Sequence, residues 1–165
     1  CSADLILTHL HTDHAGGVKQ FKHAKKILVN DRELAYAQKN KLEFVASLWE
    51  GVPLETFKFD RSDIGPANES YDLFGDGTIQ LVYLPGHTPG LTGILIQNNG
   101  KCLLLTSDCG YARKSWEQMI LPGVMADREN TIKSLKWIQQ LSQQKDCIDC
   151  LATHEMELDA MILEI

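Results

Sequence analysis

Near the start of the chain, an apolar segment leads directly into a run of metal-binding side chains. Residues 4–8 have the composition of a strand, and four donors follow within six residues: His9, His11, Asp13 and His14. Side chains two positions apart in an extended segment point the same way, so His9 and His11 can reach one metal ion. Asp13 and His14 follow where the chain turns towards a helix, and they can reach a second ion. Imidazole and carboxylate groups bind zinc and similar divalent ions, so the run predicts a metal site at a strand end.

Three more donors stand directly after later predicted strands. They are His87 after Thr78–Leu84, Asp108 after Lys101–Thr106 and His154 after Cys150–Thr153. Each one alone has an ordinary explanation as a cap or turn residue. Together they place an aspartate or a histidine after three successive buried strands, where α/β sheets commonly carry their active sites. His23 lies among lysines and is predicted to be a solvated surface residue.

The other segments alternate between predicted strands and helices. Strands are expected at 26–29, 71–74 and 91–97, and helices at 15–21, at 31–39 with Asp31 as cap, at 41–49 and at 127–143 with Asp127 as cap. Residues 51–70 are predicted to be irregular. Strands with helices outside them predict one α/β layered domain that covers residues 1–165.

Composition excludes several classes of protein. The net charge of −6 argues against non-specific nucleic-acid binding. The apolar runs are too short to cross a bilayer, and Asp4 interrupts the first of them, which argues against a signal peptide. Five cysteines do not match a secreted disulfide framework, so a cytoplasmic protein with reduced thiols is expected. A redox or metal role for Cys147 and Cys150, which form a C-x-x-C motif, is the alternative.

The H-x-H-x-D-H run, the later Gly-His, the strand-end Asp and the final His together resemble the metallo-β-lactamase superfamily. The resemblance implies an αβ/βα four-layer sandwich that holds two divalent ions, with zinc expected and iron or manganese as alternatives. It implies that His9, His11 and His87 hold one ion, that Asp13, His14 and His154 hold the other, and that Asp108 bridges them. Such domains usually begin with several strands before the motif, so we expect N-terminal strands to be missing from this chain or supplied by a partner in a homodimer.

Tyr111 narrows the resemblance to one subgroup. The segment Asp108-Cys109-Gly110-Tyr111 and the residues up to Asp127 resemble the N-acyl homoserine lactonases, which act in quorum quenching. The resemblance implies a hydrolase in which metal-activated hydroxide attacks a lactone carbonyl, Tyr111 stabilises the oxyanion, and Asp108 or Asp13 handles the proton. Glu155 departs from this subgroup, which has aspartate after the final histidine.

Other activities of the superfamily remain open from the sequence. A glyoxalase II-like thioesterase would use the same metals with a different pocket. A flavodiiron-type redox module would need a flavin domain and more carboxylate ligands. The chain is also compatible with an inactive structural or regulatory fragment. The expected partner is a small ester or lactone, with residues 51–70 forming part of an acyl-chain pocket, and neither nucleic acid nor a membrane is expected.

Overall fold

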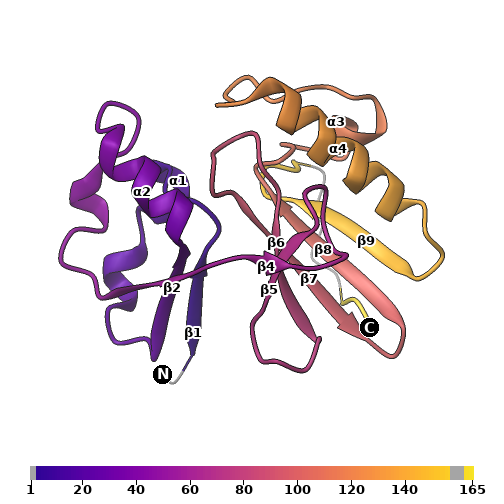
Figure 1. Cartoon of the computed structure of the whole chain (residues 1–165), viewed down its shortest axis with the longest axis horizontal. Coiled ribbons are helices and arrows are strands. Elements are labelled where there is room, and N and C mark those ends of the chain that lie inside the picture. Colours follow the sequence, from indigo (N-terminus) through magenta and orange to yellow (C-terminus); the bar gives the residue numbers. More distant parts are fainter. Residues whose placement is uncertain (1–2, 157–161) are drawn as a thin grey trace. The chain divides into compact units, whose positions relative to one another are not determined.

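The structure, a computed structural model, describes residues 3–156 and 162–165. The chain divides into two compact units, of which the first ends at Lys58 and the second begins at Phe59 (Figure 1). Each unit has its own sheet, its own helices and its own apolar core, and each is described by itself. Among the described residues, no helix combines the length and the apolar character needed to cross a membrane.

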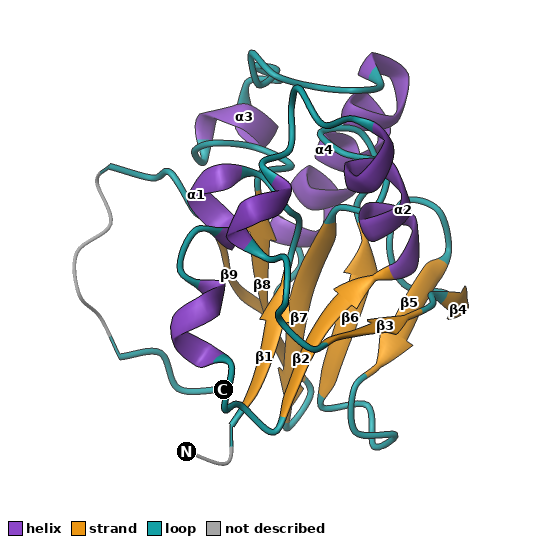
Figure 2. Cartoon of the chain, turned by 90° about the vertical axis from the view of Figure 1, so that its left-hand side faces the viewer, coloured by secondary structure: helices purple, strands orange, loops and turns teal. Residues whose placement is uncertain are grey.

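The first unit is built on a three-stranded parallel sheet in the order β1-β2-β3. Its strands are β1 (Asp4–Leu7), β2 (Lys26–Asn30) and β3 (Leu54–Phe57), which Figure 2 shows side by side. Parallel strands need crossover connections, and here these carry α1 (Thr12–Ala15), α2 (Asp31–Lys39) and the 3₁₀ turns Val18–Phe21 and Ala46–Leu48. Buried residues from β1, β2, α2 and the loops form one core, which includes Leu10, Val29, Ala37, Phe44 and Trp49.

The second unit is built on a six-stranded sheet in the order β4-β5-β6-β7-β8-β9. The strands are β4 (Asp60–Arg61), β5 (Glu69–Asp72), β6 (Ile79–Tyr83), β7 (Thr92–Asn98), β8 (Lys101–Ser107) and β9 (Cys147–Ala152). Neighbours are antiparallel except β8 and β9, which are parallel. The carboxyl ends of β8 and β9 therefore meet at the same edge of the sheet.

The crossover from β8 to β9 carries two helices, α3 (Lys114–Glu117) and α4 (Arg128–Ser142), which Figure 1 shows on one side of this sheet. The predicted cap is confirmed, because the Asp127 carboxylate accepts a hydrogen bond from Asn130 N at 3.0 Å. Leu135, Ile138 and Leu141 of α4 are buried in the core of this unit. This packing fixes α4 against the sheet and fixes the loops that precede it.

The predicted helix 41–49 is wrong, because only the 3₁₀ turn Ala46–Leu48 forms there. Phe44 explains the difference: it is buried and packs on the rings of His11 and Tyr36. These tertiary contacts override the helical propensity of the segment. The predicted helix 15–21 is also divided, since α1 ends at Ala15 and a 3₁₀ turn starts at Val18.

Strand and cap boundaries differ in several further places, among them the strand predicted at 71–74, which is β5 (Glu69–Asp72). Residues 51–70, predicted to be irregular, contain β3 and β4, which are only four and two residues long and form by pairing with β2 and β5. The last strand begins at Cys147 rather than Cys150. The cap of α2 is Asn30, whose side chain accepts from Arg32 N at 3.0 Å, and not Asp31.

Candidate metal centre

The loop that follows β1 is fixed by one apolar side chain and one buried carboxylate. Leu10 lies between His9 and His11, and its side chain is completely buried in the core of the first unit. Its backbone N–H donates to Glu33 Oε1 at 3.0 Å, and Glu33 is itself fully buried in the first turn of α2. A buried carboxyl group of this kind holds the backbone firmly, because its hydrogen bonds are not shared with water.

This loop brings the four donors of the predicted run together. The ring centroids of His9 and His11 are 4.9 Å apart, and those of His9 and His14 are 4.0 Å apart. His14 Nε2 lies 3.6 Å from Asp13 Oδ2. Ligand atoms of His9 and His11 lie within 4.8 Å of each other, as do those of Asp13 and His14. The structure therefore brings the four donors of the run close together, and their assignment to particular ions stays a prediction.

The ring of His11 is oriented by residues that the sequence did not single out. Its Nε2 lies 3.1 Å from Glu43 Oε1, and its face stacks on Phe44 with centroids 4.8 Å apart. A carboxylate only accepts, so Nε2 carries the proton and Nδ1 keeps its lone pair in the neutral imidazole. Tyr36 also lies beside the Glu43 carboxylate. Burial and the nearby Glu43 raise the pKa of its phenol. Nothing local in the sequence marks Glu43, because the contact spans 32 residues.

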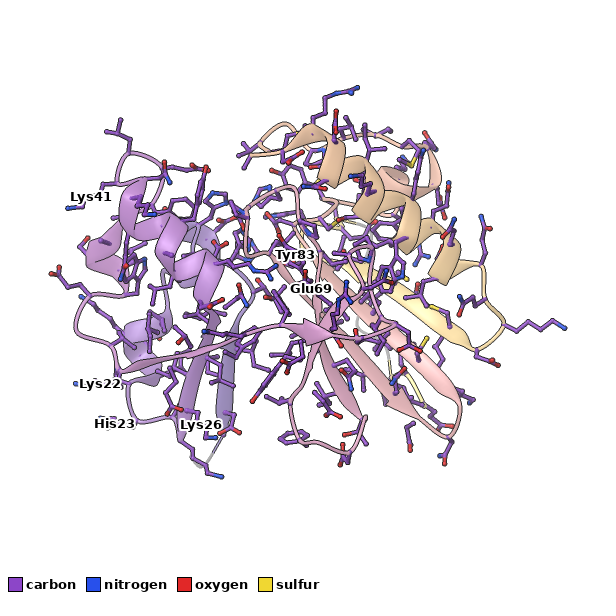
Figure 3. The ribbon with its side chains drawn as sticks, in the orientation of Figure 1. Lys22, His23, Lys26, Lys41, Glu69 and Tyr83 are labelled. Carbon is purple, nitrogen blue, oxygen red and sulfur yellow. The ribbon has the colours of Figure 1, made fainter. Side chains whose placement is uncertain are left out.

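His23 takes no part in this group. It is exposed, and Figure 3 shows it at the surface with Lys22 and Lys26, as predicted.

In the second unit, the loop after β6 holds His87 against the start of α4. Gly86 has a φ of +141°, and a Cβ there would lie 2.5 Å from Thr131 Cα, so this position requires glycine. The His87 side chain is buried, and its Nδ1 donates to the Val124 carbonyl at 2.8 Å. Since a carbonyl only accepts, Nε2 is the nitrogen that carries the lone pair when the imidazole is neutral.

Asp108 stands where β8 ends and is almost completely buried, with 3% of its surface exposed. Ser107 before it has a φ of +49°, a strained value for a residue with a side chain, and this turn carries Asp108 out of the strand. Two histidines face the same carboxylate oxygen. His87 Nε2 lies 3.7 Å and His154 Nε2 lies 3.2 Å from Asp108 Oδ2.

The donor set of this second group fits a divalent cation. A neutral His87 presents a lone pair to a carboxylate oxygen, and two acceptors that face each other need a proton or a cation between them. Imidazole nitrogen and carboxylate oxygen are the donors that zinc and related ions prefer. The three residues that the sequence placed at strand ends thus converge on one point within the second unit.

Tyr111 lies beside this group. Its ring centroid is 5.2 Å from that of His154 and 6.0 Å from that of His87. Glu155, the departure from the lactonase pattern, accepts a hydrogen bond from Arg113 N at 2.8 Å. Glu155 therefore connects the segment that carries His154 to Arg113, which caps α3 and lies two residues after Tyr111. No local sequence pattern indicates that contact.

Comparison with known proteins identifies the class to which this fold and these donors belong. The family model of the metallo-beta-lactamase superfamily matches residues 4–143. The chain therefore belongs to the metallo-β-lactamase superfamily, and the predicted α/β layered fold class with mixed sheets and helices is confirmed.

Within that superfamily, the chain is similar to N-acyl homoserine lactonases, as its sequence predicted. The lactonase AttM of Agrobacterium fabrum is 32% identical over 149 residues, which cover 86% of this chain and 54% of the relative. A crystal structure of B. thuringiensis AiiA with N-decanoyl-L-homoserine bound at the active site matches with a TM-score of 0.71 and 26% identity over 92% of this chain and 55% of that one. An N-acyl homoserine lactone hydrolase with N-hexanoyl-L-homoserine bound at its catalytic metal center matches equally well, with a TM-score of 0.71. The chain spans about half the length of the relatives that it matches.

Proposed function

We propose that the whole protein is a metal-dependent hydrolase that opens the ring of an N-acyl homoserine lactone. The observation that carries the proposal is the convergence of His87 and His154 on the buried Asp108 carboxylate in a chain of this superfamily. We further propose that residues 1–165 form one domain in which the donor groups of both units act together. We also propose that the protein works in the cytoplasm.

Seven residues would hold two divalent ions, zinc being the expected metal. His9, His11 and His87 would bind one ion, Asp13, His14 and His154 the other, and Asp108 both. Support comes from the two donor groups, each gathered within its own unit, and from the orientation of His11 by Glu43 and of His87 by the Val124 carbonyl. A histidine whose second nitrogen is fixed in this way presents its other nitrogen at low entropic cost.

Divalent ions bound there would lower the pKa of water to give hydroxide near neutral pH and would polarise a carbonyl. The protein's own groups then orient the reaction. Tyr111, beside His87 and His154, would donate its phenolic hydrogen to the developing oxyanion. Asp108 or Asp13 would accept the proton of the attacking water and return it to the leaving alkoxide.

The lactone substrate is supported by the relatives, whose names are N-acyl homoserine lactonases, and by a solved relative with a ring-opened product at its metal centre. A glyoxalase II-like thioesterase is the rival, because it would use the same donors. Glu155 does not decide between them, since its carboxylate bonds to the Arg113 backbone.

The test is a hydrolase screen of the full native protein, with metal analysis on the same sample. Lactones should be hydrolysed faster than thioesters, and about two divalent ions should be bound per chain, because seven ligands exceed the four that one zinc usually takes. His11→Ala should lose one ion. Preference for thioesters would favour the rival enzyme, and a fully loaded protein that hydrolyses neither would favour a regulatory role. Light scattering of the same sample separates a monomer from a homodimer.

A further inference from the structure

A second cluster of donor atoms lies in the second unit, at the opposite ends of the strands that carry Asp108 and His154. Cys102 is near the start of β8 and Cys147 begins β9, and the two are directly paired across these parallel strands. Asp108 follows the other end of β8. At about 3.3 Å per residue along the strands, Cys102 lies roughly 20 Å from Asp108, and Cys150 lies roughly 13 Å from His154. The cysteines therefore form a separate feature of the molecule.

A β-bulge brings Cys147 and Cys150 to the same face of β9. Residues three apart in a regular strand point to opposite faces. In this pairing Cys102 lies opposite Cys147 but Leu103 lies opposite Asp149, so Ile148 is an extra residue. Cys150 consequently shares a face with Cys147, and the two sulfur atoms are 3.8 Å apart. The C-x-x-C motif is thus a pair of adjacent thiols in the folded chain.

The two thiols differ in access. Cys150 is buried in the core formed with α4, with 1% of its surface exposed. Cys147 is half-buried, and its thiol donates weakly to the Asp149 carbonyl at 3.6 Å. Burial raises the pKa of the Cys150 thiol, so this group stays protonated at neutral pH. A reagent from solvent therefore meets Cys147 first.

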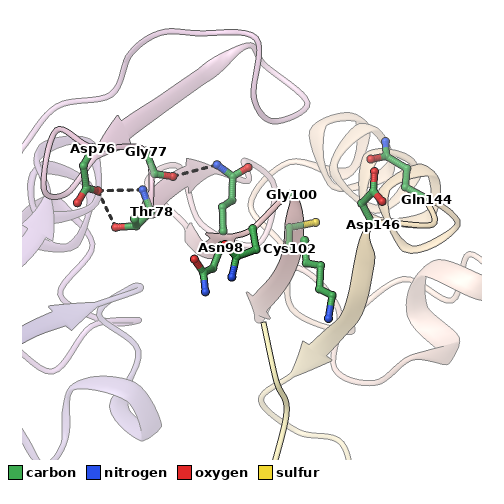
Figure 4. Close-up of a pocket in the computed structure, with 11 residues that line it drawn as sticks. Asp76, Gly77, Thr78, Asn98, Gly100, Cys102, Gln144 and Asp146 are labelled. Carbon is green, nitrogen blue, oxygen red and sulfur yellow. Dashed lines mark hydrogen bonds between the residues drawn. The ribbon is translucent and has the colours of Figure 1, made fainter.

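Next to this pair, an open pocket of about 600 Å³ is lined by Cys102, Gln144 and Asp146, and Figure 4 shows the Cys102 sulfur between the Asn98–Gly100 turn and Asp146. Burial raises the pKa of the Cys102 thiol to about 11, and Cys147 contributes to that shift. Cys102 therefore stays in its thiol form at neutral pH, and it is the cysteine that lines the pocket.

We propose that Cys147 and Cys150 are a site of reversible exchange with a small-molecule disulfide. The Cys147 thiolate attacks one sulfur of that disulfide, forms a mixed disulfide and releases one small thiol. Cys150 then loses its proton, and its sulfur displaces the second small thiol to form the Cys147–Cys150 bond. Two electrons and two protons leave the protein thiols, and the small disulfide is reduced to two thiols.

The experiment treats the full native protein with glutathione disulfide at constant metal content and maps its tryptic peptides. Trypsin cuts after Lys101, Arg113 and Lys145, so Cys147 and Cys150 stay in the peptide that begins at Asp146, while Cys102 lies in the peptide 102–113. The peptide from Asp146 should lose two hydrogens by itself, and dithiothreitol should restore them. A link between the two peptides, or a glutathione adduct that never closes to a disulfide, would overturn the proposal.

Three variants make the result specific. Cys150→Ser should stop at a stable glutathione adduct on Cys147, and Cys147→Ser should leave this peptide unmodified. Cys102→Ser is the matched control, because it removes a neighbouring thiol and should leave the internal disulfide unchanged. Loss of the disulfide in a folded Cys102→Ser protein would show that Cys102 takes part and would contradict the assignment to the pair.

Discussion

The two units supply candidate metal ligands in different ways. In the first unit, four donors come from six consecutive residues of one loop. In the second, three donors come from three loops that are far apart in the sequence, and the sheet brings His87 and His154 to the Asp108 carboxylate. A local run is visible in a sequence because backbone geometry alone brings its side chains together, whereas donors at strand ends meet only when the strands pair in the correct register.

The two groups are also held differently. The first depends on carboxylates of the same unit, since Glu33 binds the Leu10 backbone and Glu43 binds the His11 ring. The second depends on close backbone packing, at Gly86 against Thr131 and at Gly110, where an added Cβ would lie 2.6 Å from the Ser115 side chain. Replacement of the supporting carboxylates should therefore disturb the geometry of the first group. Changes in the core or in the strand-end donors should disturb the geometry of the second.

Removal of the central carboxylate of the second group should have the largest effect. Asp108→Ala removes the group that two histidines face and that is assigned to both ions. We expect kcat/KM on a lactone to fall by about 1000-fold or more, because Lewis-acid stabilisation by the ions amounts to several kcal/mol. Cys109→Ala is the control, since burial raises the pKa of its thiol to about 12 and it has no assigned ligand role. Near wild-type hydrolysis by both variants would refute the bridging assignment.

Tyr111→Phe should have the next largest effect. The change removes one hydroxyl beside His87 and His154 without altering the ring packing. We expect kcat on a lactone to fall by roughly 10- to 1000-fold, the upper value being the cost of one lost oxyanion donor. Metal content should hardly change, because the phenol is not a ligand. If kcat and KM were both unchanged in a metal-replete protein, Tyr111 would have a packing role. That result would favour a thioesterase over a lactonase.

Glu43→Ala tests the carboxylate support in the first unit. Without Glu43, the His11 ring loses the contact at 3.1 Å that fixes its tautomer. We expect metal affinity to fall by about 10- to 100-fold, as is typical for the partner of a metal-binding histidine. A competition titration against a chelator measures it. Glu50→Ala, another exposed glutamate in the same connection, is the control, and equal affinities for the two variants would remove Glu43 from the site.

Asp127→Ala should have the smallest effect. It removes the cap of α4 and leaves the N–H of Asn130 without its partner at 3.0 Å. The free energy of unfolding should fall by about 1 kcal/mol, measured as a lower urea midpoint. Asp127→Asn should retain most of the stability, since asparagine is an equally good cap. Lys133→Ala, exposed on the same helix, controls for surface changes, and an equal loss there would argue against capping.

Much of the fold could be predicted from local patterns. The strands around Ile79–Tyr83 and Thr92–Asn98, the turn between β7 and β8, and α4 with its Asp127 cap all follow from alternation, turn residues and capping chemistry. The predictions fail where partners decide the conformation. Residues 41–49 do not form the predicted helix because Phe44 packs on His11. β3 forms because its backbone pairs with the edge of β2.

The sequence by itself determined that the donors from His9 to His14 lie close together as candidate metal ligands, because neighbours in one loop cannot be far apart. It also identified the family, since the later Gly-His, Asp and His follow the run in the order that the superfamily's motifs have. Only the tertiary structure decided that His87 and His154 face the same oxygen of Asp108, that Glu43 orients His11, and that a bulge at Ile148 makes Cys147 and Cys150 adjacent. Each of these contacts depends on strand register, on a crossover or on packing between distant segments, and no local propensity encodes them.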